Sequence, residues 1–429
     1  MMTRSLYLLV FILLISLPLK INYSDNYNLQ GNSEKISLNY TILTNNDNLI
    51  DSVSILKKVN RFMNKWDLKG ISLAIIKDEK LVYANGFGEA NNSQPMLSGN
   101  IFRVASVSKL ITAVAIMKLV EDGKLSLDNK VFGADGILKF SELNNAVDKR
   151  IYDITIRHLL VHTAGLTKKY GDLAFNPLLV SQLINEENPV TNRSFYKFIA
   201  STKLARAPGQ IVVYSNLGYI FLADVINNIA GESYESYVRN KILIPNGITD
   251  MHLGYSSRNS RYPNEVAYYA HEGSELTEEW NGSGLMVEKT YGGNPIELLT
   301  GAGGWVCSAV ELARFITLID GESAVPDILS PKSIQEMTDS NYAVGPLGWA
   351  SVTENGEWLR TGSMTGTMAM VKKQDDGTYW VFLSNSSSWR GSNLSKEISA
   401  FMKNISAEIR YKPDYDLFNF YKWNSLAQK

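Results

Sequence analysis

The chain has 429 residues and a formal net charge of −1, and 45% of its residues are hydrophobic and 20% charged. This composition is typical of a globular chain with ample core, and the length suits two or three domains or one large α/β enzyme with an inserted subdomain. The near-neutral charge gives no support for nucleic-acid binding, the single cysteine excludes an intrachain disulfide, and the four scattered histidines show no zinc-binding spacing.

The N-terminus carries the pattern of an export signal. Arg4 precedes an apolar run from Leu6 to Leu17 that ends at Pro18. This run is shorter than the roughly 20 residues of an ordinary transmembrane helix. No small-x-small cleavage motif follows it, so an uncleaved anchor is the alternative, and no cysteine follows it for a lipoprotein anchor. We expect residues 1–19 to be a signal peptide or short anchor and the protein to be secreted or periplasmic, with the membrane contacted only through such an anchor.

The first predicted elements follow a segment of low periodicity. Residues 20–47 are rich in asparagine and serine, so we expect a linker there. A helix is predicted over about 49–66. Residues 71–76 and 81–84 have the pattern of a β-hairpin around a Lys-Asp-Glu-Lys turn. Apolar residues at helical spacing over 110–120 predict a further helix.

The middle of the chain differs from its two ends. Residues 125–300 are predicted to be mostly helical, and the strongest helix covers 217–230. The sheet signal returns over 366–371 and 379–383, which form a second candidate hairpin, and a final helix is predicted over 394–409.

Strands at both ends with a helical insert between them imply one sheet whose halves are far apart in sequence. The predicted fold class is therefore α+β, with an antiparallel sheet flanked by helices and an inserted, mostly helical subdomain. We expect the domain to cover residues 48–410 and residues 411–429 to form a C-terminal tail.

Ser106 and Lys109 are the first candidates for chemistry. If this stretch opens the predicted helix, side chains three residues apart share one face and can touch. Serine is a poor nucleophile at its own pKa, and a neighbouring amine can take its proton. A helix N-terminus also favours negative charge that develops at the serine. The same spacing at Ser54 and Lys57 is interpreted as the polar side of the N-terminal helix.

Tyr214 and Asn216 are the second pair of candidates. In an extended segment, positions i and i+2 point the same way, so the phenol and the amide can face one pocket. A tyrosine with a lowered pKa can relay a proton to a leaving group. The alternative is that Asn216 caps the following helix and Tyr214 packs, and the segment taken alone favours this alternative.

The segment Arg360, Thr361, Gly362 and Ser363 precedes the second hairpin. Glycine on an edge strand lets a ligand backbone approach closely. A backbone N–H of this segment can join that of Ser106 as an oxyanion hole. Arg360 can hold a substrate carboxylate, and the alternative is a surface arginine next to a turn.

Serine-x-x-lysine, Tyr-x-Asn and basic residue-Thr-Gly, in this order, resemble the three motifs of penicillin-recognising serine enzymes. The chain resembles the serine β-lactamase-related superfamily over roughly residues 50–405, in particular class C β-lactamases, D-Ala-D-Ala carboxypeptidases and family VIII esterases. Residues 156–166 (IRHLLVHTAGL) and 301–315 (GAGGWVCSAVELARF) resemble two further segments of that superfamily. Ser24-Asp25-Asn26 matches a second-motif variant by its letters but precedes the serine.

The resemblance implies a β-lactamase/transpeptidase-like fold and assigns roles to these residues. Ser106 would be the acylated nucleophile, and Lys109 would accept its proton or keep Tyr214 poised to do so. Tyr214 would protonate the leaving group and help to activate the deacylating water. Asn216 would hydrogen-bond the substrate amide or Lys109.

The resemblance also implies a substrate-binding strand. Backbone N–H groups of Ser106 and Ser363 would form the oxyanion hole, and Arg360 and Thr361, beside Gly362, would contact a substrate carboxylate. His162 and His158 are interpreted as residues that hold the fold, because the serine already has two candidate proton acceptors.

Arg360 departs from the pattern, which usually has lysine or histidine at this position. Arginine stays charged and is longer and planar, so it attracts a carboxylate but places it differently. This difference puts efficient β-lactam turnover in doubt more than acylation itself.

The sequence therefore predicts an exported serine hydrolase that works through an acyl-enzyme at Ser106. Its predicted substrate is an ester, a D-amino-acid peptide or a β-lactam amide. Because Arg360 departs from the β-lactamase pattern, we expect the first two rather than the third. The alternative is a catalytically inactive penicillin-binding-like protein that binds peptidoglycan or a protein partner. We expect a small-molecule or peptide substrate, no metal or organic cofactor and no nucleic-acid partner, and the sequence does not indicate the oligomeric state.

Overall fold

The computed structural model describes residues 40–42, 52–91, 94–341, 345–409 and 415–423. The predicted signal peptide or anchor lies outside these residues. Within the described ranges, no helix has both the length and the apolar character needed to cross a membrane.

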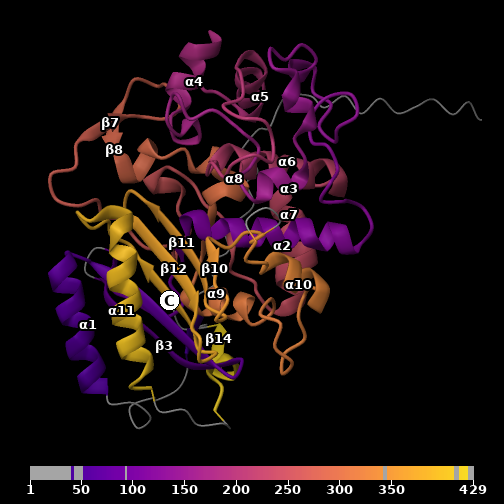
Figure 1. Ribbon diagram of the computed structural model, residues 1–429. Helices are drawn as coiled ribbons and strands as arrows, with labels where there is room; N and C mark the ends of the chain where they lie inside the picture. Colours follow the sequence, from indigo (N-terminus) through magenta and orange to yellow (C-terminus); the bar gives the residue numbers. More distant parts are fainter. Residues whose placement is uncertain (1–39, 43–51, 92–93, 342–344, 410–414, 424–429) are drawn as a thin grey trace, which may run out of the picture. The chain divides into compact units, whose positions relative to one another are not determined.

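A seven-stranded antiparallel sheet carries the fold (Figure 1). The C-terminal strand β13 pairs with the N-terminal strand β2, which confirms that the two halves of one sheet are far apart in sequence. Both predicted hairpins are present, as β2–β3 and β12–β13. Across the sheet the strands are β10 (Ser351–Val352), β11 (Trp358–Met364), β12 (Thr367–Lys373), β13 (Tyr379–Ser384), β2 (Gly70–Lys77), β3 (Lys80–Asn91) and β4 (Gln94–Pro95).

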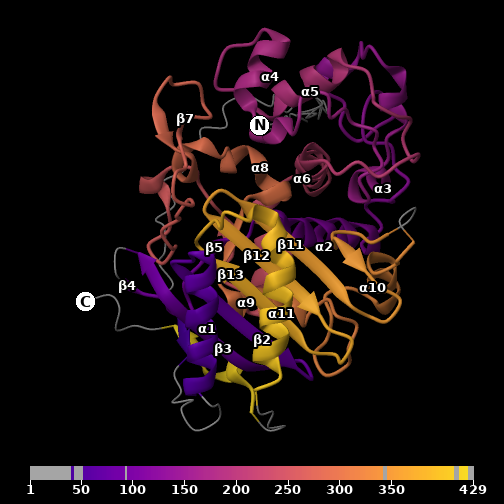
Figure 2. The same ribbon diagram turned by 60° about the vertical axis from the view of Figure 1, so that its left-hand side comes forward.

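Both faces of the sheet are buried, because alternate residues of each strand enter different cores. Leu73 and Ile75 of β2 pack in one core with the two terminal helices, α1 (Ser52–Trp66) and α11 (Ser395–Ser406). These helices lie side by side on that face (Figure 2). The intervening Ala74 belongs to the larger core on the opposite face.

The helix after Ser106, α2 (Ser108–Glu121), lies between the sheet and the helical part of the chain (Figures 1 and 2). Nearly all of its side chains are buried, because the helices α6 (Asn216–Ala230) and α8 (Ile296–Gly303) pack against it on the side away from the sheet. A helix buried on nearly every side has little polar face, which accounts for the mostly apolar sequence between Leu110 and Met117.

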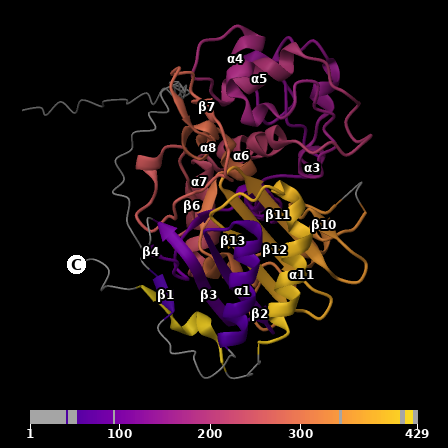
Figure 3. The same ribbon diagram turned by 90° about the vertical axis from the view of Figure 1, so that its left-hand side faces the viewer.

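The predicted helical insert contains six α-helices together with short strands (Figure 3). The strands β7 and β8 form a hairpin, and β5, β9 and β6 form a small second sheet. The helices are α3 (Ile156–Leu160), α4 (Pro177–Ile184), α5 (Asn192–Ser201), α6 (Asn216–Ala230), α7 (Tyr234–Val238) and α8 (Ile296–Gly303). The short strands within the insert are β6 (His252–Leu253), β7 (Leu276–Glu278) and β8 (Met286–Glu288). The strands β5 (Phe102–Arg103) and β9 (Trp305–Cys307) lie before and after the insert, and two more helices follow, α9 (Ala309–Ile316) and α10 (Pro331–Met337).

The start of α6 corrects one interpretation of the sequence. Ser215, not Asn216, is the N-cap, and its hydroxyl accepts the N–H of Gly218 at 3.4 Å. Asn216 is the first helical residue, so its amide is available for the pocket described below. The C-terminus agrees with the prediction, because Gly231 adopts φ +70° just after the last turn.

The predicted linker and the predicted tail each contribute one short strand, and these two strands pair with each other. Tyr40–Ile42, inside the linker, form strand β1 and pair with Tyr421–Trp423 (β14) of the tail. The tail also packs on the domain, because Leu417 is buried and the Asp416 carboxylate accepts the N–H of Leu81 at 3.1 Å. Local periodicity cannot reveal a three-residue strand whose partner is at the far end of the chain.

Candidate active site

Ser106 lies in a short 3₁₀-helix, η2 (Ala105–Val107), that leads directly into α2. Ala105 before it has φ +47°, a left-handed conformation that is unfavourable for a residue with a Cβ. Strand β11 lies against this turn at Gly362, where a Cβ would come within 2.3 Å of the Val104 carbonyl oxygen. Gly362 therefore allows the backbone around Ser106 to approach closely. The sequence analysis predicts the close approach of a ligand backbone at this position instead.

Lys109 lies one turn after Ser106 and is completely buried. Its Nζ donates to Ser106 Oγ at 3.2 Å, to Asn216 Oδ1 at 2.7 Å and to the Ala302 carbonyl at 2.5 Å. Burial lowers the pKa of Lys109 to about 8, partly offset by Tyr214, while the charge of Arg360 lowers it further. The predicted contact between serine and lysine is present, and a neutral amine is accessible near physiological pH.

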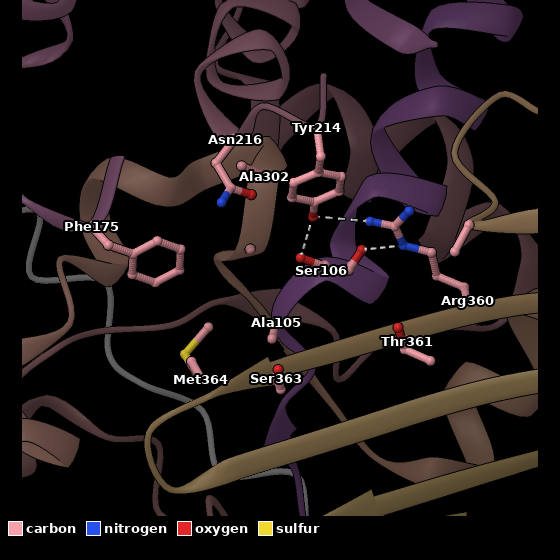
Figure 4. Close-up of a pocket in the computed structure, with 12 residues that line it drawn as sticks. Ala105, Ser106, Phe175, Tyr214, Asn216, Ala302, Arg360, Thr361, Ser363 and Met364 are labelled. Atoms are coloured by element: carbon pink, nitrogen blue, oxygen red, sulfur yellow. Dashed lines mark hydrogen bonds between the residues drawn. The ribbon is translucent and has the colours of Figure 1, made fainter. Parts of the chain in front are cut away.

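Tyr214 approaches the serine from the other side, with its hydroxyl 2.7 Å from Ser106 Oγ (Figure 4). The residue as a whole is 40% exposed, but its hydroxyl points into the pocket. Burial of the phenol raises its pKa, but the charges of Lys109 and Arg360, with hydrogen bonds from Lys109 and Ser106, outweigh this effect and lower the pKa of Tyr214 to about 8.

Arg360 is buried, with 2% of its surface exposed, so the interpretation as a surface arginine is wrong. Its Nε donates to the Ser106 carbonyl at 2.8 Å, and its Nη2 donates to the Tyr214 hydroxyl at 3.4 Å (Figure 4). The guanidinium thus contacts the serine backbone and the tyrosine before any substrate binds. Contact with a substrate carboxylate stays a prediction.

Asn216 is oriented by two hydrogen bonds of opposite polarity. Its Oδ1 accepts from Lys109, and its Nδ2 donates to Asp172 Oδ2 at 2.7 Å. Asp172 also forms an ion pair with Lys168 at 3.4 Å. The sequence analysis missed Asp172, which follows the segment 156–166 in a loop without periodicity.

The lysine's third partner, Ala302, was also missed as a site residue. It belongs to the segment 301–315 that was singled out by resemblance, but a backbone carbonyl leaves no signature in the side-chain sequence.

His162 supports the tyrosine from behind. Its Nδ1 accepts the N–H of Ser215 at 3.2 Å, and its ring centroid lies 4.5 Å from that of Tyr214. Burial, and then the charge of Lys109, hold the pKa of His162 well below its usual value, so the ring is neutral. His158 takes part in the capping box of α3 through Thr155. These contacts are structural, in line with the sequence interpretation.

The catalytic pocket has a volume of about 260 Å³ and brings Ser106, Tyr214, Asn216 and Arg360 together. Figure 4 shows Thr361 and Ser363 along the strand that forms its lower wall, with Phe175 and Met364 at the opposite side from Arg360. Within the described ranges, no three histidine, cysteine, aspartate or glutamate side chains are grouped to hold a metal ion.

Several solved structures are similar to this chain in fold. The octameric penicillin-binding protein homologue from Pyrococcus abyssi has a TM-score of 0.60 at 24% identity, over 84% of this chain and 79% of that one. A D-amino acid amidase from Ochrobactrum anthropi SV3 has a TM-score of 0.63 at 21% identity, over 82% and 98%. At these identities the likeness establishes the fold, which confirms the predicted β-lactamase/transpeptidase-like architecture.

Sequence relatives point the same way. The protein PbpX of Bacillus subtilis (strain 168) is 26% identical over 303 residues, which are 69% of this chain and 66% of PbpX. The chain thus matches slightly less than two thirds of that relative. The Beta-lactamase family model matches residues 56–400, and this match supports the assignment of the chain as a hydrolase. The chain therefore belongs to the beta-lactamase family.

Proposed function

We propose that this protein is an exported serine hydrolase that forms an acyl-enzyme at Ser106. One observation carries the proposal: Ser106 Oγ lies 2.7 Å from the Tyr214 hydroxyl and 3.2 Å from Lys109 Nζ, and both of these groups have a pKa of about 8. A base with a pKa near the working pH combines a usable deprotonated fraction with enough basicity to take the serine proton.

The chemistry follows from this arrangement. Ser106 Oγ attacks the substrate carbonyl as its proton passes to the Tyr214–Lys109 pair. The N–H groups of Ser106 and Ser363 stabilise the oxyanion. When the tetrahedral intermediate collapses, the bond to the leaving group breaks and Tyr214 returns the proton to that group. Water then attacks the ester carbonyl at Ser106 as its proton passes to the same pair. The bond to Ser106 Oγ breaks, the pair returns the proton to that oxygen, and the acid is released.

Among the substrates that this chemistry permits, we rank esters and D-amino-acid peptides above β-lactams. The guanidinium of Arg360 contacts the Tyr214 hydroxyl and the Ser106 carbonyl, so it has less freedom to follow the carboxylate of a β-lactam. The D-amino acid amidase among the structural neighbours is compatible with this ranking. Export rests on the N-terminal apolar run.

Labelling with a fluorophosphonate, followed by intact-mass measurement, tests the proposal. We expect one adduct on the wild-type chain and none on Ser106→Ala, while Ser141→Ala, which changes an exposed serine outside the pocket, labels like wild type. A folded wild-type chain without an adduct, or an adduct that persists in Ser106→Ala, would contradict the assignment. The first of these outcomes would favour a binding protein that has kept the fold without the activity.

A further inference from the structure

A chain of buried hydrogen bonds lies one helical turn beyond Lys109 and joins four elements of the fold. Trp305 Nε1 of β9 lies 2.8 Å from the hydroxyl of Tyr234 of α7, and this hydroxyl lies 2.7 Å from Thr112 Oγ1 of α2. Thr112 Oγ1 in turn lies 2.7 Å from the carbonyl oxygen of Gly301 in α8. All four residues are buried, and none of them lines the catalytic pocket. The chain of hydrogen bonds therefore lies behind the reacting groups rather than among them.

The two ends of this chain determine the direction of its hydrogen bonds. The indole N–H of Trp305 can only donate, and the carbonyl of Gly301 can only accept. Tyr234 therefore accepts from Trp305 and donates its own proton to Thr112. Thr112 donates in turn to Gly301, because the Ser108 carbonyl, at 3.2 Å, is the more distant acceptor. The hydrogen bonds thus run in one direction and end on a backbone carbonyl of α8.

The carbonyl at the end of the chain follows a strained residue. Thr300 has φ +29° and ψ −110°, which interrupts the helical geometry of α8. Such a conformation is unfavourable for a residue with a Cβ and persists only where surrounding contacts hold it. Among the described residues, the Thr300 hydroxyl is buried without a hydrogen-bond partner, so its own side chain does not hold the turn. The hydrogen bond from Thr112 to the Gly301 carbonyl supplies a contact from outside α8 that does.

The next carbonyl along this turn contacts the lysine beside the nucleophile. Ala302 accepts a hydrogen bond from Lys109 Nζ at 2.5 Å. Thr112 and Lys109 are one turn apart on α2, so they hold two successive carbonyls of α8. If the turn relaxed at Thr300, the peptide groups after it would rotate and the Ala302 carbonyl would leave the lysine. The orientation of the amine therefore depends on the conformation of this turn.

We propose that Trp305, Tyr234 and Thr112 are positioning residues that hold the Ala302 carbonyl on Lys109 and so keep its amine beside Ser106. They act through the strained turn of α8 and touch neither the nucleophile nor the pocket. The proposal rests on the proposed hydrolase function and adds to it a set of buried residues that control the proton acceptor.

Tyr234→Phe and Thr112→Val each remove one hydroxyl of the chain and keep the shape of the side chain. A hydrogen bond to an ammonium group favours its charged form, so loss of the Ala302 contact lowers the pKa of Lys109. We expect the acidic limb of kcat/KM for p-nitrophenyl acetate to move about half a pH unit lower in both variants. We expect kcat/KM above the limb to fall about tenfold, because the amine is no longer held beside Ser106. Thr112→Ser, which keeps the hydroxyl, should behave like wild type in both respects.

Tyr237→Phe is the matched control. Tyr237 belongs to the same helix as Tyr234 and is also buried, but its hydroxyl has no hydrogen-bond partner among the described residues. Its loss should leave both the limb and kcat/KM unchanged. The positioning role is overturned if the limb stays in place in Tyr234→Phe and Thr112→Val, if Thr112→Ser shifts it as far as Thr112→Val does, or if Tyr237→Phe has the same effect.

A crystal structure of Tyr234→Phe separates the two proposals, because it does not depend on activity. An Ala302 carbonyl that has turned away from Lys109 supports the positioning role, and one that keeps its place overturns it. Ester hydrolysis that Ser106→Ala abolishes but Tyr234→Phe leaves unchanged refutes the positioning role and leaves the hydrolase in place. No Ser106-dependent hydrolysis, together with no fluorophosphonate adduct, refutes the hydrolase, and the position of the Ala302 carbonyl then decides the positioning role.

Discussion

Charged side chains lie on both sides of the Lys109–Tyr214 pair that takes the serine proton. Lys109 contacts the serine directly, Arg360 contacts Tyr214, and Asp172 contacts Asn216, which in turn contacts Lys109. Because Lys109 and Tyr214 interact closely, they titrate as a pair. The charges on either side of the pair set the pH at which the pair becomes basic.

The charge of Arg360 lowers the pKa of both Lys109 and Tyr214. Arg360→Ala should therefore raise both pKa values and move the acidic limb of the kcat/KM profile, expected near pH 8, to higher pH. Since Arg360 also holds the Ser106 carbonyl, we expect neutral esters to lose activity too, by about tenfold or more. Arg360→Lys should restore the position of the limb. An unchanged limb in Arg360→Ala would show that the arginine does not tune the pair.

Asp172 acts in the opposite direction, because its charge raises the pKa of Lys109. Asp172→Asn removes the charge but leaves an amide oxygen that can accept the hydrogen bond from Asn216. We therefore expect the acidic limb of kcat/KM to move to lower pH. Asp172→Ala should in addition lower kcat, because the amide of Asn216 is no longer oriented. A limb that moves to higher pH in Asp172→Asn would contradict this account.

Among the elements, β11 is the strand that lies beside Ser106 and carries the predicted substrate-binding residues. The short strand β10 pairs only with Trp358 and Leu359, so no described strand pairs with the rest of β11 on that edge. The other edge of β11 is paired along its full length with β12. The edge of β11 that faces β10 is therefore open where Arg360 and Ser363 line the pocket. Gly362 allows β11 to lie against η2.

Gly362→Ala tests this contact. The added Cβ would lie 2.3 Å from the carbonyl oxygen of Val104. This oxygen belongs to the backbone, so it cannot rotate away as a side chain can. We expect a loss of about 1–3 kcal/mol in the free energy of unfolding, measured by denaturant titration. We also expect kcat/KM to fall about a hundredfold, because the oxyanion donors and the serine are displaced.

Gly218→Ala is the control for this prediction. It lies within α6, and its added Cβ would make only ordinary contacts from 3.5 Å. We expect it to retain both stability and activity. A Gly362→Ala enzyme with wild-type kcat/KM would show that the distance between β11 and η2 is not critical.

At the scale of the whole molecule, the sequence predicted the elements with strong local patterns and the long-range pairing that joins them. The hairpins and the C-terminal end of α6 could be predicted because each depends on neighbouring residues. The long-range pairing could be predicted because strand patterns occur at both ends of the domain with a helical insert between them. The grouping of Lys109, Tyr214 and Asn216 around Ser106 followed from the resemblance.

What the sequence could not supply depends on contacts between distant segments. Asp172 reaches Asn216 from a loop without periodicity, and Ala302 contributes a carbonyl that any residue carries. The strand pair β1–β14 joins segments near opposite ends of the chain. Arg360 was read as a surface or substrate-facing residue because nothing in its neighbours reveals that η2 covers it.

The pairing of β13 with β2 also determines when the central sheet can form during synthesis of the chain. Lys69, just before β2, donates its N–H to the Ser386 hydroxyl, 317 residues further along. The central strands can therefore join only after almost the entire chain has left the ribosome. Until then the hairpin β2–β3 lacks its neighbour, and the closure of so long a loop makes folding slow. Because Arg360 of β11 contacts the Ser106 carbonyl, the nucleophile gains this neighbour only once the sheet has closed.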